Sequence, residues 1–399
     1  MDSVELAARE SYGRLLSILA VRTKDLAGAE DALADAFVSA LKQWPIDGVP
    51  RNPEAWLLTV ARRRLVDAAR RQRTRDEKHV LLEVSDAEAD GELFGDERLR
   101  LLFVCAHPAI DAAVRTPLML QTVLGLDAAR IASAFRIAPK TMGQRLWRAK
   151  TKIREARIPF DVAVEEIPER SFAVLEAIYA AYGTGWEDVA GGTSASRGLT
   201  EEAIWLARLT VRLLPDEPEA RGLLALLLYA EARAKARRGE GGEYIPLTEQ
   251  DPSRWDSQRI AEAEVILRDA SRMGRVGPLQ LEAAIQSAHI DARRSGARDD
   301  RAVSLLYEAL VRLAPTLGVR VAHAVALSQT EGPARGLELL DAIESSDDYQ
   351  PYWSARAHLL ERIGRLDDAR DAYDRAAGLA EDDGVRRWLL AKKRTLGGV

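Results

Sequence analysis

The sequence of 399 residues has a single cysteine and few aromatic residues, which make up 6% of the chain. With Cys105 alone, no internal disulfide can form and no structural zinc site can be built from thiolates. No apolar run is long enough to cross a bilayer, and the N-terminus lacks the layout of a signal peptide. Walker A, HExxH and nucleophile-elbow motifs are missing as well. We therefore expect a cytoplasmic protein that is not an enzyme and has no catalytic residue, metal, cofactor or membrane contact.

The residues that are abundant favour helices. Hydrophobic residues make up 47% of the chain and charged residues 30%, as in ordinary soluble proteins. Alanine, leucine and arginine dominate, and all three form helices well. The length allows two or three domains, each with its own core. The composition predicts an all-α protein.

Residues 126–156 are predicted to form a helix, a tight turn and a second, basic helix. Asp127 is placed to cap the first helix, which ends near Phe135, and Pro139 suits the first position of the second. The apolar positions of the second helix share one face: Met142, Leu146, Ala149 and Ile153. Donors that reach base edges or phosphates start at Lys140 and continue on the opposite face: Thr141, Gln144, Arg145, Arg148 and Lys152.

A basic face of a helix is more often exposed to solvent without a partner than used to recognise DNA. Here the turn, the cap, the proline and the one-sided basicity agree, so that a DNA-binding helix-turn-helix is favoured. Gly143 interrupts the second helix at a cost of about 1 kcal/mol relative to alanine, and it would permit close approach of the backbone to DNA.

The net charge of −5 is unevenly distributed along the chain. Residues 98–158 carry 12 Lys/Arg against 3 Asp/Glu, and residues 1–75 carry 13 against 10. Residues 76–97 carry 1 Lys/Arg against 9 Asp/Glu and are predicted to form an acidic linker. Such a negatively charged segment can also compete with nucleic acid for a cationic channel. The basic charge is concentrated where a phosphate backbone would need it.

The first 75 residues are predicted to be helical, with one break. Residues 5–42 form two or three helices, and the stripe of Ala29, Leu33, Ala36, Phe37 and Leu41 faces inward. Prolines make residues 44–53 a loop. An Arg-rich helix is predicted to follow from Glu54, with six arginines between residues 62 and 73. Its basic side chains either face solvent without a partner or form one wall of a groove for single-stranded nucleic acid.

The first 160 residues resemble an extracytoplasmic-function sigma factor of bacterial RNA polymerase. The matching stretches are AEDALADAFVSAL for region 2.2, NPEAWLLTVARRRLVDAARR for regions 2.3 and 2.4, and RLRLLFVCAHPAI with LDAARIASAFRIAPKTMGQRLWRAKTKIREARIPF for region 4. The family often has Asn where this chain has Arg62-Arg63-Arg64, so individual promoter contacts do not transfer there. The resemblance implies promoter DNA and core RNA polymerase, through its β′ clamp helices and β flap, as partners.

The resemblance also implies roles for individual residues. The polymerase clamp helices would meet Glu30, Asp31 and Asp35. The melted downstream promoter element would bind Asn52, Trp56, Arg62, Arg63, Arg70 and Arg71. The upstream element would be read by Lys140, Thr141, Gln144, Arg145, Arg148 and Lys152, and the acidic linker would thread towards the RNA exit path.

The remaining 239 residues are predicted to form helical pairs. Residues 352–376 carry the spacing of a tetratricopeptide repeat, and further second-helix segments begin at Ala203, Ala302 and Ala334. Residues 239–256 interrupt the array as an ordered loop that Tyr244, Ile245 and Trp255 allow to pack. The chain also resembles a sigma-factor subgroup with a tetratricopeptide-like C-terminal extension, which would be regulatory and have its own protein partner.

Four segments are thus expected. They are a sigma region 2 domain at 1–75, an acidic linker at 76–97, a region 4 helix-turn-helix domain at 98–160 and a helical-repeat domain at 161–399. The expected function is promoter-specific initiation by RNA polymerase, regulated by the fused C-terminal domain. The main alternative is a DNA-binding regulator with a tetratricopeptide sensor that acts without polymerase.

Overall fold

The computed structural model describes residues 3–75, 97–135, 137–188, 194–240, 242–343, 348–380 and 382–396. Within these ranges the regular structure is helical, apart from one antiparallel bridge between Arg238 and Tyr244. The predicted all-α fold is therefore confirmed. The chain divides into two compact units, Met1–Thr184 and Gly185–Val399.

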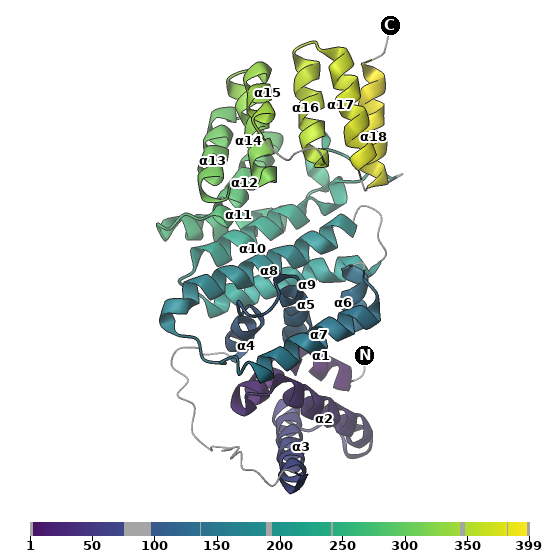
Figure 1. Ribbon diagram of the computed structural model, residues 1–399, viewed down its shortest axis with the longest axis vertical. Helices are drawn as coiled ribbons and strands as arrows, with labels where there is room; N and C mark the ends of the chain where they lie inside the picture. Colours follow the sequence, from purple (N-terminus) through teal and green to yellow (C-terminus); the bar gives the residue numbers. More distant parts are fainter. Residues whose placement is uncertain are drawn as a thin grey trace. The chain divides into compact units, whose positions relative to one another are not determined.

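The helices of the first unit, unit 1, are drawn in colours that run from purple through blue to teal (Figure 1). They are α1 Ser3–Thr23, α2 Leu26–Asp47, α3 Pro53–Arg75, α4 Glu97–Cys105, α5 Ala112–Leu124, α6 Ala128–Ala134, α7 Pro139–Glu155, η1 Val164–Glu166 and most of α8 Ile167–Asp188.

The second unit, unit 2, begins at the end of α8. Its elements are α9 Ser194–Leu213, α10 Pro218–Ala232, η2 Ala234–Ala236, η3 Leu247–Glu249, η4 Pro252–Arg254, α11 Ser257–Arg272, α12 Pro278–Ser295, α13 Asp300–Leu313, α14 Leu317–Thr330, α15 Pro333–Asp341, α16 Gln350–Arg362, α17 Leu366–Leu379 and α18 Asp383–Thr395.

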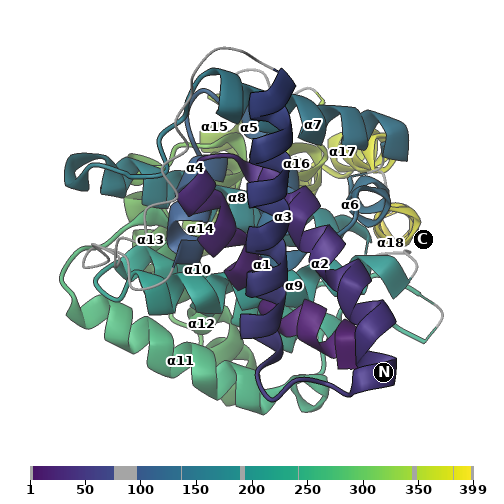
Figure 2. The same ribbon diagram turned by 90° about the horizontal axis from the view of Figure 1, so that it is seen from below.

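Helix α1 is the centre of unit 1. It packs against α2, α3, α4 and α5, and Figure 2 shows it among α2 and α3. Its buried side chains are Leu15, Leu16, Leu19 and Ala20. Because one helix supplies apolar surface to both neighbouring groups of helices, α1–α3 and α4–α7 share a single core. The expected domains at 1–75 and 98–160 thus lie within one compact unit.

Helix α2 continues further than its prolines suggested. The prediction of a loop from residue 44 is wrong, because α2 runs through Pro45 to Asp47. Pro45 lies in the last turn on an exposed face, so the carbonyl that loses its N–H partner is accessible to solvent. Gly48 ends the helix at φ +86°. The inward stripe is also shorter than predicted, since Leu41 is 51% exposed.

The end of unit 1 lies beyond residue 160. Thr116 Oγ1, on α5, donates a buried hydrogen bond of 2.9 Å to the carbonyl oxygen of Ala177, on α8. Val174, Leu175 and Ile178 of α8 are also buried. Residues 161–184 thus belong to the first unit, whereas the sequence placed them in the C-terminal domain. The predicted acidic linker lies outside the described residues except for Glu97, which begins α4.

Unit 2 consists of successive antiparallel helix pairs. Helix α14 packs on α15, and α16 packs on α17 (Figure 1). The predicted repeat at residues 352–376 coincides with α16 and α17, joined at Gly364, whose φ is +79°. Its signature positions are buried: Tyr352, Ala355, Ala357, Leu360, Ala369, Tyr373 and Ala376. Of the other predicted second-helix segments, those at Ala302 and Ala334 lie in α13 and α15, which pack on the preceding α12 and α14, whereas the one at Ala203 lies in α9, which packs on the following α10. Unit 2 has a tetratricopeptide-like repeat fold.

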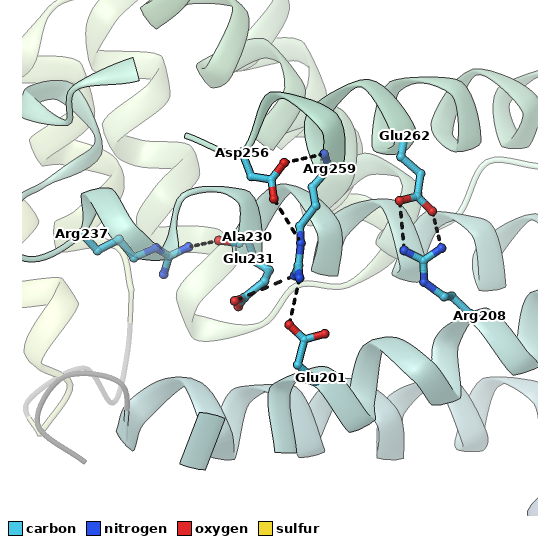
Figure 3. A network of polar contacts seen from close by, with 8 residues as sticks. All are labelled: Glu201, Arg208, Ala230, Glu231, Arg237, Asp256, Arg259 and Glu262. Atoms are coloured by element: carbon cyan, nitrogen blue, oxygen red, sulfur yellow. Dashed lines mark hydrogen bonds and ion pairs between the residues drawn. The ribbon is translucent and has the colours of Figure 1, made fainter. Parts of the chain in front are cut away.

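An ion network ties α9, α10 and α11 together (Figure 3). The Arg259 guanidinium lies 2.9 Å from Glu201 Oε1, 3.9 Å from Glu231 Oε1 and 3.5 Å from Asp256 Oδ2. Beside it, Arg208 of α9 forms a bidentate pair with Glu262 of α11. Burial raises the pKa of Glu231, although Arg259 opposes the shift. Each partner of Arg259 comes from a different segment, so the network fixes how these helices pack.

The ordered loop predicted at 239–256 packs against the last helix. Tyr244 meets Trp388 edge-on, with ring centroids 5.8 Å apart, and Trp255 is buried. Arg238 donates hydrogen bonds of 3.1 and 2.8 Å to the two carboxylate oxygens of Asp382. The same carboxylate accepts a bond of 2.7 Å from the Val385 backbone N–H and caps α18. These contacts join segments 144 residues apart.

We predict that Asp382→Asn destabilises unit 2 in a pH-dependent way. Burial raises the pKa of Asp382, but the hydrogen bonds and charge of Arg238 outweigh it and hold the pKa below its ordinary 3.8. The stabilisation is therefore present above pH 4 and is lost as the pH falls through the lowered pKa. At pH 7 the free energy of unfolding of the variant should be lower by about 1–2 kcal/mol. The asparagine amide oxygen can still cap α18, but it carries no charge to pair with Arg238.

Guanidinium denaturation between pH 3 and pH 7 checks this. The matched control is Asp383→Asn, which removes a neighbouring carboxylate that pairs with Arg386 across one exposed turn. Two results would contradict a stabilising role for the Asp382–Arg238 pair. One is an equal loss of unfolding free energy in both variants, and the other is a difference between Asp382→Asn and wild type that does not decrease at low pH.

Candidate nucleic-acid interface

Helices α6 and α7 have the predicted helix, turn and helix geometry. Asp127 Oδ1 accepts hydrogen bonds of 2.9 Å from the backbone N–H groups of Ala129 and Arg130, and so caps α6. Pro139 occupies the first turn of α7. The apolar side chains of α7 are buried as predicted: Met142, Leu146, Ala149 and Ile153. The burial of this stripe fixes which side of α7 faces solvent.

The solvent face of α7 carries every residue predicted to read the upstream element. All six are exposed: Lys140, Thr141, Gln144, Arg145, Arg148 and Lys152. Two more residues share this face, Trp147, which is 66% exposed, and Thr151. The prediction missed Trp147, although its position one residue after Leu146 puts it off the buried stripe. A large exposed indole beside Arg148 adds apolar and stacking surface to the donors.

Gly143 also lies on α7 and has open space beside it. A Cβ built there meets no atom within 4 Å. Packing inside the protein therefore does not require a glycine at this position, and an approaching surface would have access to the backbone.

The residues predicted to bind the downstream element are differently placed. Asn52 Oδ1 accepts a 3.0 Å hydrogen bond from the Ala55 N–H and caps α3, while Trp56 packs edge-on against Trp44 at 5.6 Å. Both residues thus shape the start of α3. Arg62 and Arg63 are exposed on that helix. Arg70 and Arg71 belong to the same helix, but the structure does not describe their side chains.

The three acidic residues of α2 are not equivalent. Asp31 and Asp35 are exposed, whereas the Glu30 side chain is only 15% exposed and pairs with Lys150 of α7. Burial raises the pKa of Glu30, and the charge of Lys150 opposes that shift. The sequence did not distinguish these residues, because all three occupy polar positions of one helix.

Cys105 lies close to this pair. Its thiol is fully buried and contacts Thr122 Oγ1 at 3.4 Å. Burial raises the pKa of Cys105 to about 12, with a smaller contribution from Glu30, while Thr122 and Lys150 lower it. Among the described residues no group of His, Cys, Asp and Glu is arranged to hold a metal ion.

Comparison with known families assigns the first three helices. Residues 8–75 match sigma-70 region 2. Residues 8–75 are thus a sigma-70 region 2, which supports a sigma-70 family protein. A region 2 implies binding to core RNA polymerase and to promoter DNA. The exposed acidic residues of α2 and the exposed arginines of α3 lie within this region. Every helix in the described ranges is too short or too polar to cross a bilayer.

Other comparisons extend beyond region 2. An uncharacterized protein of Rhizobium meliloti (strain 1021), R00370, is 39% identical over 393 residues, which cover 95% of this chain and 92% of that one; the two belong to one family. Residues 170–271 match a family of unknown function, DUF6596. The crystal structure of yeast Tom70 aligns with 99% of this chain and 84% of its own, at 12% identity and a TM-score of 0.37, which is too low to support a conclusion.

We predict that Cys105 does not react with thiol reagents in the folded protein. Raising the pKa from 9.0 to about 12 lowers the thiolate fraction at pH 8 by about 1000-fold, and burial adds steric protection. Labelling with a chromogenic disulfide at pH 8, with and without guanidinium, measures the difference. Modification of the native protein at a rate near that of the unfolded chain would show that the packing around α4 is wrong.

Proposed function

We propose that this protein is a sigma factor of the extracytoplasmic-function type, which directs bacterial RNA polymerase to specific promoters and helps to hold them open. The supporting observation is the combination of a sigma-70 region 2, at α1–α3, with an exposed basic helix, α7, in one compact unit. Polymerase would perform the chemistry, and the sigma factor would contribute positioning and strand capture.

The upstream promoter element is proposed to bind the solvent face of α7. Arg145 and Arg148 can each donate two parallel hydrogen bonds to guanine, and Gln144 can do the same to adenine. Lys140 and Lys152 lie near the two ends of the helix, where they can hold phosphates. Trp147 would contact a thymine methyl group or a sugar beside these donors.

The melted downstream element is proposed to bind beside α3. Arg62 and Arg63 provide exposed cationic charge on the helix that begins next to Asn52 and Trp56. Unstacked bases need such charge along the backbone together with a shaped surface close to it. The Trp44–Trp56 contact makes the start of α3 a fixed wall of this kind.

Core polymerase is proposed to bind the exposed face of α2. Asp31 and Asp35 lie there beside the exposed apolar side chains of Val38 and Leu41. Apolar contact surrounded by charge is the usual composition of a protein interface. The β′ clamp helices are the proposed partner of this face, and the β flap that of α4–α7.

Unit 2 is proposed to regulate initiation. Its helical repeats provide a scaffold that is suited to protein recognition, and the chain ties it covalently to the sigma unit. Either polymerase, a further protein or the sigma unit itself would be its binding partner.

Substitution of the α7 arginines tests the DNA assignment. We expect Arg145→Ala and Arg148→Ala each to weaken use of the cognate promoter by about 10-fold to 100-fold, because each loses a bidentate base contact. The assay is transcription reconstituted from sigma-free core polymerase on a promoter identified by transcript mapping. Core binding should be unchanged, and Arg22→Ala, an exposed arginine of α1, is the control.

The same assay separates the proposal from its alternative. A sigma factor makes initiation at this promoter depend on its presence, whereas a regulator that acts without polymerase binds duplex DNA but does not confer promoter-specific initiation. Duplex binding without such initiation would contradict the proposal.

Deletion of residues 189–399 tests regulation by unit 2. The cut keeps α8 whole, since its buried contact with α5 belongs to unit 1. We expect the remaining unit to bind core polymerase while transcription from the cognate promoter changes several-fold in rate or in response to the inducing condition. Circular dichroism checks that the unit stays helical. An unchanged rate and response would rule out control by the fused domain.

A further inference from the structure

Gly143 of α7 is a glycine that neither packing nor backbone conformation requires. Among the glycines whose surroundings the structure describes, every one except Gly143 and Gly378 has a positive φ or an atom that an added Cβ would approach within 3 Å. A Cβ at Gly143 meets nothing within 4 Å in the described part of the chain, the side chains of Lys140 and Trp147 included. Because glycine is also a poor helix former, the fold does not explain its presence here.

The position of Gly143 suggests a role in DNA recognition. It is the fifth residue of a helix that begins at Pro139, and the second helix of a helix-turn-helix contacts base edges through its N-terminal residues. Lys140 precedes it by three residues and Trp147 follows it by four, so both side chains flank it on the helix surface. Lys140 is exposed, and Trp147 is 66% exposed. The missing side chain thus leaves a notch, the Gly143 notch, between Lys140 and Trp147.

The chemistry of the Gly143 notch is apolar. Gly143 lies inside α7, where backbone N–H and C=O groups bond along the helix, so the floor of the notch offers the Cα surface and no free donor or acceptor. The indole of Trp147 and the methylene stem of Lys140 form its walls. Such a surface is stabilised by covering a carbon group and destabilised by covering an unpaired polar one.

One base carries the matching group in the major groove. Thymine presents its C5-methyl group there, whereas the other bases present hydrogen-bond donors and acceptors without a methyl group. The notch has room for one such group, since the space that an added Cβ would occupy is itself the space of one methyl group. The exposed Gln144 and Arg148 lie beside it and can bond to the edges of neighbouring bases.

We propose that Gly143 is a specificity-determining residue, and that the Gly143 notch holds the C5-methyl group of one thymine in the upstream promoter element. The assignment rests on the proposed sigma function, which brings α7 to that element. Uracil has the same hydrogen-bonding groups as thymine but lacks the methyl group. A uracil at this position would therefore keep every hydrogen bond and leave the notch empty.

Replacement of single thymines by uracil tests the notch from the DNA side. Each thymine of the upstream element is replaced in turn in the duplex promoter identified by transcript mapping. Binding of the full-length protein, assembled with core polymerase, is measured at one fixed salt concentration. We expect one replacement to weaken binding by about 3-fold to 10-fold, the loss expected for one buried methyl group. The other replacements make the same chemical change elsewhere and are the controls.

Gly143→Ala tests the same contact from the protein side. The alanine methyl group takes the place of the thymine methyl group, so the variant should bind the original promoter about 3-fold to 10-fold more weakly than wild type does. It should bind the sensitive uracil promoter better than the thymine promoter, which reverses the wild-type preference. Alanine favours the helix and meets no atom, so the melting temperature should be no lower than that of wild type. The control is Gly378→Ala, in α17 of unit 2, where the added Cβ also meets nothing within 4 Å.

The outcomes separate the notch from the function on which it rests. A reversed preference in Gly143→Ala, with Gly378→Ala like wild type, supports the notch. The notch is overturned, and the sigma function left standing, if no single thymine is sensitive or if Gly143→Ala binds both promoters equally weakly, as a general effect on the helix would produce. An unchanged preference in Gly143→Ala, or an equal change in Gly378→Ala, overturns it as well. Absence of promoter-specific binding with core polymerase in every protein, wild type included, overturns the proposed sigma function instead.

Discussion

A buried charge requires a partner of opposite charge, and in unit 1 this requirement connects α2 and α7, two helices for which different ligands are proposed. Glu30 and Lys150 lie at the edge of the core that surrounds α1, where each would be costly without the other. Other arginines and lysines of α7 can be solvated because the stripe through Met142 and Ile153 already fixes the helix. The packing of α2 on α7 is therefore the part of the unit that is sensitive to a single charge.

The uneven charge of the sequence follows from this arrangement. Basic side chains are concentrated on the exposed side of α7 and along α3, while the acidic side chains of α2 are divided between solvent and the α7 contact. Unit 2 uses its charges differently, since Arg259 and Arg238 each satisfy carboxylates from other segments of that unit. In the first unit much of the charge faces outward and suits binding, whereas in these networks it stabilises the repeat packing.

Local features were predictable from the sequence because they depend on near neighbours. The phase of α7, the Asp127 cap, the position of Pro139 and the repeat at α16–α17 all follow from spacings of a few residues. Pro45 was misjudged since a proline near the end of a helix loses only a solvated hydrogen bond. Trp147 was overlooked because an aromatic residue is expected in the core. Glu30 was placed outside because helical periodicity separates polar from apolar positions but does not show which polar position a distant helix covers.

The same distinction explains unit 2. Its small residues predict helix pairs, but the contact of Arg238 with Asp382 joins positions 144 residues apart and has no local signature. A repeat array bends through small changes at each interface, so a link between an early loop and the final helix opposes bending. The Tyr244–Trp388 contact reinforces this link with apolar surface. If unit 2 regulates initiation as proposed, a partner of the repeats would bind a scaffold that resists bending. The partner would then act through the surfaces that it covers more than by changing the curvature of the array.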